Sequence, residues 1–401
     1  MKFSKSSQLF LVSSIGLLVA VLLAGCQLVT IDYLYVASST GIETFAVDSE
    51  SGALRASGSM VTAGVSNPAA LAVTSDYANL YVANQGNNTV VHYTIAINGT
   101  LTQKDSVTLG AVPVSLAVNA ANTYLYVVSG TTSATLTEYA LSSGTIGSAA
   151  VEQALTLSGS YASDTILPTG VTVLANNDAV YVTAYDRSAY NPGGTTTCPV
   201  IGCANPGWIF GYAVGSGGAL TAASGSPWEA GVKPSALVAD PTDRFVYVTD
   251  YASNQLIGYS ILNNNVLQFM LDSPFKTGSE PAAIVVDPRG KFLYVANALS
   301  STVSAYSITL TTGIPTATVN ATSSSLSSTD TEPVAVAVDP ALGRFVYTAN
   351  YLGNTISGFK LDPTSGAVTA TQSTPYPTSG QKPTALVAIP HGNHATQSVA
   401  P

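Results

Sequence analysis

The sequence predicts an all-β fold: a seven-bladed β-propeller of four-stranded antiparallel blades, closed by a C-terminal strand that joins the N-terminal blade. Three observations lead to this prediction. A tyrosine-centred string occurs seven times along the chain, strand and turn signals surround each copy, and each end of the chain lacks one part of the pattern that the other end supplies.

The repeated string is a tyrosine followed by β-branched and small residues, as in Tyr81-Val82-Ala83-Asn84. Successive copies are 46, 45, 55, 66, 47 and 53 residues apart. A fixed aromatic residue at a period near fifty, in β-branched company, is typical of an array of β-units. The copies begin at Tyr35, Tyr81, Tyr126, Tyr181, Tyr247, Tyr294 and Tyr347.

The sixth copy shows the expected elements of one blade in order. An apolar first strand over residues 282–286 leads into Asp287-Pro288-Arg289-Gly290, where proline and glycine favour a tight turn. A second strand follows over 292–296, and alternating residues predict a third over 303–308, with a less regular edge strand after it.

The two ends of the chain complement each other. A proline opens the first strand of each blade, and the last of these prolines, Pro383, has no tyrosine strand after it. The tyrosine strand at Tyr33 has no proline strand before it. We therefore expect residues 383–389 to supply the inner strand of the first blade, which removes the exposed sheet edges of an open array. The opening prolines are Pro68, Pro113, Pro168, Pro234, Pro281, Pro333 and Pro383.

The N-terminus has the features of a secretory signal. Lys2 and Lys5 precede an apolar run over residues 9–23, which is short and interrupted for a membrane span. Leu23-Ala24-Gly25-Cys26 resembles the lipobox of bacterial lipoproteins, which implies cleavage before Cys26 and acylation of its thiol. The residue after this cysteine is Gln27 and not aspartate, which resembles the lipoproteins that diderm bacteria sort to the outer membrane. An ordinary signal or a membrane anchor is the alternative.

The chain thus divides into a signal peptide (1–25), a lipid anchor with a short linker (26–32), the propeller (33–390) and a tail (391–401). We expect a monomer at the bacterial cell envelope, held to the membrane through lipid on Cys26. Without the signal peptide, 11 basic residues face 22 acidic ones. Such a body is repelled by polyphosphate, so we expect no nucleic-acid partner.

The two remaining cysteines, Cys198 and Cys203, lie in a long insert after the fourth tyrosine strand. In an oxidising compartment they predict a disulfide, and a metal site is the alternative. The insert is expected to lean over the mouth of the propeller channel or, alternatively, to decorate the surface. No cofactor is expected.

Strings such as Glu280-Pro281 with Asp287-Pro288-Arg289-Gly290-Lys291-Phe292-Leu293-Tyr294-Val295-Ala296-Asn297 resemble the lactonase-family propellers. That family includes propeller-type 6-phosphogluconolactonases and muconate cycloisomerases of the same fold. The strings also resemble the YVTN-repeat propellers of bacterial surfaces. The likeness covers nearly all of residues 33–390, and it implies a hydrolase that opens a cyclic ester. Its enzymatic branch is associated with histidine, arginine and glutamate at the channel mouth. No histidine of this chain is assigned there, since His92 lies in a strand and His391 and His394 follow the last one.

Loops at the channel mouth supply the candidate site residues. A lactone hydrolase needs a base to activate water and a cation or donor to stabilise the oxyanion. Glu280 or Glu332 could be the base, and Arg187, Lys233 or Lys382 could stabilise charge. The alternative is that these groups are rim charges, solvated or paired across blades. The candidate substrate-binding residues are Lys233, Lys382, Asp250, Tyr251, Asn297, Asn350 and Tyr351; Asn84 and Asp186 are also expected near the mouth.

Two functions remain open at this stage. The first is an envelope-anchored hydrolase acting on a small-molecule lactone at the channel mouth. The second is a non-catalytic propeller that binds a glycan, a peptide or a partner protein.

Overall fold

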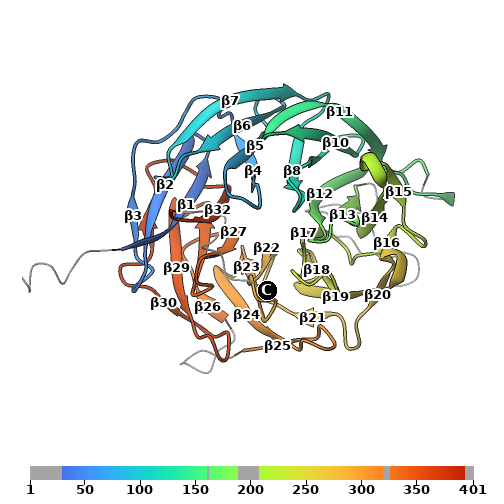
Figure 1. Ribbon diagram of the computed structural model, residues 1–401. Coiled ribbons are helices and arrows are strands. Elements are labelled where there is room, and N and C mark those ends of the chain that lie inside the picture. The colour runs from blue at the N-terminus through green and yellow to red at the C-terminus, as the bar shows by residue number, and fades with distance from the viewer. Residues whose placement is uncertain (1–28, 160–161, 188–206, 319–325, 393–401) are drawn as a thin grey trace, which may run out of the picture.

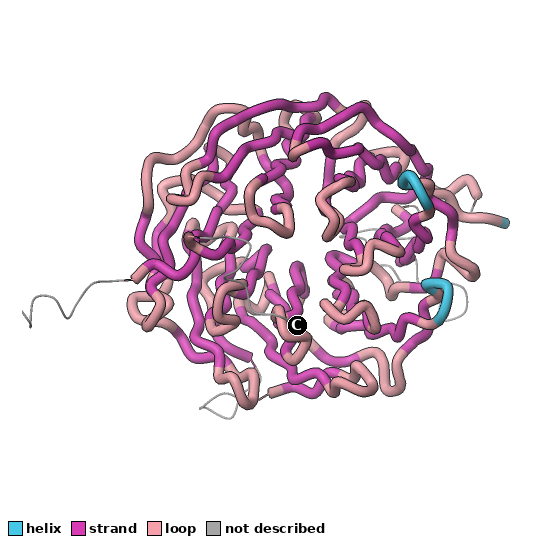
Figure 2. Tube along the Cα trace, viewed as in Figure 1, coloured by secondary structure: helices cyan, strands magenta, loops and turns pink. Residues whose placement is uncertain are grey.

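The computed structural model describes residues 29–159, 162–187, 207–318 and 326–392. Seven antiparallel sheets stand around one axis, with the first strand of each sheet innermost (Figure 1). Strands make up nearly all of the regular structure among the described residues, and two short 3-10 helices, η2 (Ser216–Gly218) and η3 (Asn263–Asn265), lie at the outer rim (Figure 2). The predicted all-β, seven-bladed fold is confirmed.

The first three blades have four strands each, named here from the innermost outwards. Blade 1 contains β32 (Ala385–Pro390), β1 (Thr30–Ser38), β2 (Gly41–Asp48) and β3 (Leu54–Ala56). Blade 2 contains β4 (Pro68–Val73), β5 (Asn79–Asn84), β6 (Thr89–Ile95) and β7 (Leu101–Thr108). Blade 3 contains β8 (Pro113–Val118), β9 (Tyr124–Ser129), β10 (Thr135–Ser142) and β11 (Thr145–Ala154).

The other four blades add a short fifth strand, which pairs with the third. Blade 4 contains β12 (Ile166–Val173), β13 (Ala179–Asp186), β14 (Gly207–Val214), β15 (Leu220–Ala222) and β16 (Trp228–Glu229). Blade 5 contains β17 (Pro234–Ala239), β18 (Phe245–Asp250), β19 (Gln255–Ile261), β20 (Leu267–Phe269) and β21 (Phe275–Lys276). Blade 6 contains β22 (Pro281–Val286), β23 (Phe292–Asn297), β24 (Thr302–Ile308), β25 (Pro315–Ala317) and β26 (Leu326–Ser328). Blade 7 contains β27 (Pro333–Val338), β28 (Phe345–Asn350), β29 (Thr355–Leu361), β30 (Val368–Ala370) and β31 (Tyr376–Pro377).

The ring closes through one strand from each end of the chain. β32 pairs antiparallel with β1, in a register that runs from Ala385 opposite Ala37 to Pro390 opposite Asp32. Ala388 lies opposite Leu34, so the C-terminal strand forms the inner edge of the N-terminal blade as the sequence predicted. This pairing covers the inner edge of β1, as the first strand covers the second in every other blade.

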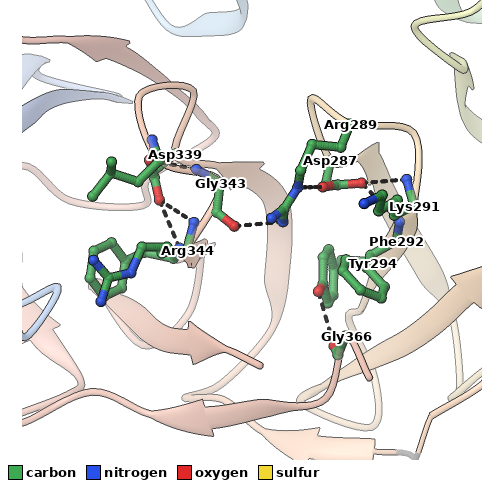
Figure 3. Close-up of polar contacts among 11 residues, drawn as sticks. Asp287, Arg289, Lys291, Phe292, Tyr294, Asp339, Gly343, Arg344 and Gly366 are labelled. Carbon is green, nitrogen blue, oxygen red and sulfur yellow. Dashed lines mark hydrogen bonds and ion pairs between the residues drawn. The ribbon is translucent and has the colours of Figure 1, made fainter. Parts of the chain in front are cut away.

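The repeated tyrosines join neighbouring blades. Each of the seven is fully buried. Six donate a hydroxyl hydrogen bond to a backbone carbonyl in a hairpin turn of the next blade; Figure 3 shows the bond from Tyr294 to Gly366, which is 2.9 Å long. We call these six contacts the tyrosine latches. The pairs are Tyr35–Gly99, Tyr81–Gly144, Tyr181–Asn265, Tyr247–Gly313, Tyr294–Gly366 and Tyr347–Gly52.

Most of the latched turns need glycine because an aromatic ring of the preceding blade fills the space of a side chain. A Cβ atom at Gly366 would lie 2.2 Å from a ring carbon of Phe292, and one at Gly52 would lie 2.3 Å from Phe345. Both glycines also have positive φ, which favours glycine. The repeat therefore specifies an aromatic residue and a glycine as a pair across each of these two blade boundaries.

Aspartates in the turns between first and second strands fold these hairpins. The Asp287 carboxylate accepts hydrogen bonds from the N–H groups of Lys291 and Phe292, and Asp339 accepts them from Arg344 and Phe345 (Figure 3). Arg289 contacts Asp287 at 2.6 Å. These aspartates therefore form turns, as the sequence analysis expects.

Blade 3 is the blade whose repeated tyrosine, Tyr126, makes no latch. The residue opposite the repeated tyrosine is glycine or alanine in blades 4 to 7, but it is Glu138 opposite Tyr126 in blade 3. Glu138 is fully buried, and its burial raises the pKa of the carboxyl to about 7. The Tyr126 hydroxyl faces this carboxyl and makes no latch.

No helix within the described ranges is long and apolar enough to cross a membrane. The predicted lipidation at Cys26 and the predicted Cys198–Cys203 disulfide lie outside the described residues, so both stay predictions.

Candidate functional site

The residue that directly follows each opening proline lies at the axial face of the ring. In six blades the pairing of the first and second strands shifts register at this residue, as between Pro281 and Ala283. Such a bulge lets the chain turn one side chain out of the ladder. These residues, which we call the axial ring, are Ala69, Val114, Thr169, Ser235, Ala282, Val334 and Thr384; all seven line depressions in the surface.

Two adjoining depressions share this ring. The large depression, about 550 Å³, is lined by blades 3 to 7, with Arg187, Lys233 and two tyrosines around it. The small depression, about 380 Å³, is lined by blades 1, 2, 3 and 7. Val114 and Val334 line both, so the two depressions adjoin at these residues. Both volumes fall within the ~300–1,000 Å³ of small-molecule sites.

Lys233 and two tyrosines line the large depression, and the Glu280 carboxylate is bonded to one of these tyrosines. The Tyr251 hydroxyl donates a 2.5 Å hydrogen bond to the Glu280 carboxylate. The Lys233 ammonium nitrogen lies 4.4 Å from the centre of the Tyr251 ring and 5.8 Å from that of Tyr185. Cation–π contact stabilises such an arrangement. Burial lowers the pKa of Lys233, and the nearby Glu280 opposes this shift.

The backbone around Glu280 is held firmly. Its N–H donates to the Asn254 side chain at 2.7 Å, and its carbonyl accepts from the N–H of Ala298 at 2.8 Å. Glu280 adopts a φ of 55°, in the left-handed region that is uncommon outside glycine. Asn67, Glu332 and Lys382 also have positive φ values, so the residue before the opening proline has this conformation in four blades.

The other predicted charges are spread around the two depressions. Arg187 is exposed, lines the large depression and donates to the Thr131 carbonyl at 3.5 Å. Glu332 and Tyr351 line the small depression. Lys382 is exposed, with its ammonium nitrogen 5.5 Å from the centre of the Tyr351 ring.

Three predicted substrate-binding residues are buried inside the blades. Asp250, Asn297 and Asn350 are each 0% exposed. The Asp250 carboxylate accepts hydrogen bonds from the N–H groups of Val232 and Lys233. The amide nitrogens of Asn297 and Asn350 donate to hydroxyls of the adjoining third strands. We assign these side chains a positioning role, because they fold the loops that carry the exposed residues.

Asn84 and Asp186 are also buried. The Asn84 carbonyl oxygen accepts from the N–H of Ser66 at 3.0 Å, which ties the opening loop of blade 2 to its second strand. His92 lies inside blade 2, where its ring nitrogens contact Asp105 at 2.7 Å and Asn79 at 2.9 Å. Among the described residues, no three histidine, cysteine or acidic side chains are grouped to hold a metal ion.

The sequence reasoning missed the axial ring itself. It also missed Tyr185, Asn67 and Gln85, which line the depressions. A signal was present for the ring, because each of its members directly follows an opening proline. Asn67 precedes one of these prolines, so its position is equivalent to those of Glu280 and Glu332.

The fold has known relatives among solved structures. A periplasmic gluconolactonase from Pseudomonas aeruginosa is 20% identical, with a TM-score of 0.71 over 90% of this chain and 99% of that chain. A 6-phosphogluconolactonase candidate from Bacteroides fragilis is 19% identical, with a TM-score of 0.71 over 90% and 98%. At these identities the likeness establishes the fold. A comparison with curated protein sequences finds no match.

The sequence profile described as "Lactonase, 7-bladed beta-propeller" matches residues 30–158 and 218–326, which is more than half of the chain. With the seven-bladed ring and its closure, this match shows that the chain belongs to the lactonase family of seven-bladed β-propellers.

Proposed function

We propose that this protein hydrolyses a lactone in the large depression, with Glu280 as the general base. The contact that carries the proposal is the Tyr251–Glu280 hydrogen bond beside Lys233. It holds the Glu280 carboxylate against Tyr251, which lines the large depression together with the half-buried Lys233, and this depression is large enough for a small ligand.

The reaction requires a proton transfer and charge stabilisation. Water adds to the carbonyl carbon, the ring C–O bond breaks, and an open hydroxy acid forms. Glu280 takes the proton from the attacking water and returns it to the ring oxygen as that oxygen leaves. Lys233 and Arg187 stabilise the negative charge that develops on the carbonyl oxygen. Tyr251 is a positioning residue, since its hydroxyl holds Glu280 and its ring faces Lys233.

The geometry favours Glu280 over Glu332 as the base. Within the described part of the chain, Glu280 has a tyrosine hydroxyl bonded to its carboxylate and a lysine beside it. Glu332 lines the small depression, and among the described residues no hydrogen bond reaches its carboxylate. A base held in one orientation is better placed to act on a bound water.

Membership of the lactonase family supports a cyclic ester as the substrate. The similar fold of the Pseudomonas aeruginosa gluconolactonase supports glucono-δ-lactone as the first probe.

The test compares Glu280→Gln with Glu229→Gln, a matched change at an exposed residue of β16 away from the depressions. Hydrolysis of glucono-δ-lactone is followed as acid release, after subtraction of the spontaneous rate. We expect Glu280→Gln to lower kcat by roughly 10²–10⁴, the usual contribution of a general base, and Glu229→Gln to leave it unchanged. Glu332→Gln should have a much smaller effect than Glu280→Gln. Equal rates for Glu280→Gln and the unaltered protein would rule out the assigned base.

A binding propeller without catalysis is the second candidate, supported by the polar side chains that line the small depression. No lactone turnover, together with measurable glycan binding by calorimetry, would favour it.

We also propose that the protein is exported and anchored to the cell envelope by lipid on Cys26, with a disulfide between Cys198 and Cys203. The lipobox-like string supports the anchor, and an oxidising compartment would permit the disulfide. A mass two hydrogens below that of the reduced form, restored by reductant, is the expected mark of the disulfide. Two free thiols in the exported protein would exclude it.

A further inference from the structure

We infer that the small depression is a second sugar subsite, so that the preferred substrate is a disaccharide lactone: an aldonolactone that carries one further uncharged sugar. This inference rests on the proposed function of the large depression. It starts from the shape of the axial face, where two depressions of about 550 and 380 Å³ adjoin at Val114 and Val334, which line both.

The two depressions differ in their side chains. The large one is lined by the two cationic groups assigned to the reaction, Lys233 and Arg187, and by two tyrosines. The small one is lined by the amides of Asn67 and Gln85, the Tyr351 ring and the Glu332 carboxylate. Amide groups both donate and accept hydrogen bonds, which matches the hydroxyl groups of a sugar. A tyrosine ring adds an apolar face against which the carbon face of a sugar ring can pack.

The amides of the small depression are not used by the protein. Within the described ranges, the side chains of Asn67 and Gln85 have no hydrogen bond to another residue, whereas those of Asn84, Asn297 and Asn350 are bonded inside the blades. The Asn67 carbonyl accepts from the N–H of Gln85 at 3.0 Å, so the backbone holds these two residues side by side. Preorganised polar groups of this kind provide specificity in small-molecule sites.

The charge of the small depression selects the kind of second unit. Its lining contains one carboxylate, Glu332, and the Lys382 ammonium nitrogen lies 5.5 Å from the centre of the Tyr351 ring in the same lining. One negative and one positive group leave the small depression without a net charge, which suits an uncharged sugar. Lys233 and Arg187, which are assigned to the lactone carbonyl, line the adjoining large depression. One ligand of two units therefore fits the axial face better than two separate ligands.

The test measures kcat/KM for glucono-δ-lactone and for the lactones of cellobionic and maltobionic acid. We expect at least one disaccharide lactone to be hydrolysed about tenfold more efficiently than glucono-δ-lactone, the effect of one to two neutral hydrogen bonds and a ring contact. The double variant Gln85→Ala/Tyr351→Ala should lower that preference ratio about tenfold. Gln268→Ala, a matched change on the exposed outer strand β20, should leave the ratio as it is.

The outcomes separate the two proposals. Hydrolysis of glucono-δ-lactone without a preference for either disaccharide lactone would overturn the second subsite and leave the proposed function standing. A preference for a disaccharide lactone that is unchanged in the double variant would likewise overturn the second subsite and leave the proposed function standing. Failure of the unaltered protein to hydrolyse any of the three lactones would overturn both proposals. The Gln85→Ala single variant, with a smaller expected loss, covers the case in which the double variant does not fold.

Discussion

Glu138 should make this protein less stable as the pH rises, and its replacement by glutamine should remove that loss. The side chain is 0% exposed at the boundary of blades 3 and 4, where Gly218 lies against it. Neither carboxylate oxygen has a hydrogen-bond partner in good geometry within the described residues. Burial raises the pKa of Glu138 from 4.5 to about 7. A buried carboxyl without a cation beside it prefers to be neutral.

The direction of this pH dependence follows from whether the folded or the unfolded state binds the Glu138 proton more tightly. Because the folded protein holds the Glu138 proton more strongly than the unfolded chain does, stability is greatest below the unfolded pKa of 4.5. It falls as the pH rises towards about 7 and is level above that. The shift from 4.5 to about 7 corresponds to at most about 3.5 kcal/mol of unfolding free energy, at about 1.4 kcal/mol per pKa unit.

Denaturant unfolding at about pH 5 and about pH 8 measures the effect. We expect Glu138→Gln to match the unaltered protein within about 1 kcal/mol at the lower pH and to exceed it by ~2–3 kcal/mol at the higher pH. Glu152→Gln, on the exposed face of the adjacent strand β11, is the control and should show no such divergence. Parallel stability curves for Glu138→Gln and the unaltered protein would refute the reasoning, because they would mean that Glu138 is ionised in the fold without cost.

Three further predictions concern the latches, the turns and the anchor. Tyr294→Phe removes a 2.9 Å hydrogen bond between blades and should lower the unfolding free energy by about 1–1.5 kcal/mol, whereas Tyr126→Phe, which removes no latch, should not; equal losses in denaturant titrations would contradict the latch assignment. Gly366→Ala places a Cβ atom 2.2 Å from a ring carbon at a φ of 76°, so we expect a loss of about 2–4 kcal/mol. Gly58→Ala, at a φ of 78° with no atom within 4 Å, should lose only about 1 kcal/mol, and a similar loss at both sites would argue against the steric account. Cys26→Ser should move the exported protein from the membrane fraction to the soluble fraction, and unchanged membrane association would exclude the lipid anchor.

The repeat allowed the blades to be predicted from the sequence because each copy carries its own strand and turn signals. Asp287 and Asp339 show this well, since each folds a turn with backbone groups only a few residues away. The short fifth strands were not predicted as strands. Their two or three residues pair with residues of a third strand that lie 19 to 26 positions earlier, and so brief a pairing leaves no periodic pattern.

The candidate site was predicted less completely than the fold. Loop positions such as Tyr251, Glu280 and Tyr351 could be placed near the axis, because loop order follows from strand order. The direction of each side chain could not. Asp250 and Tyr251 are neighbours in the sequence, yet Asp250 turns inward to bind backbone N–H groups of the opening loop while Tyr251 lines the large depression.

The sequence by itself determined how many blades there are and how the ring closes. Each blade is encoded in one continuous segment, and the unmatched Pro383 and Tyr33 strands could be satisfied only by pairing with each other. Only the tertiary structure decided which groups share a depression. Tyr185, Lys233 and Glu280 come from three successive blades, so their distances depend on how the sheets pack around the axis, which no local pattern records.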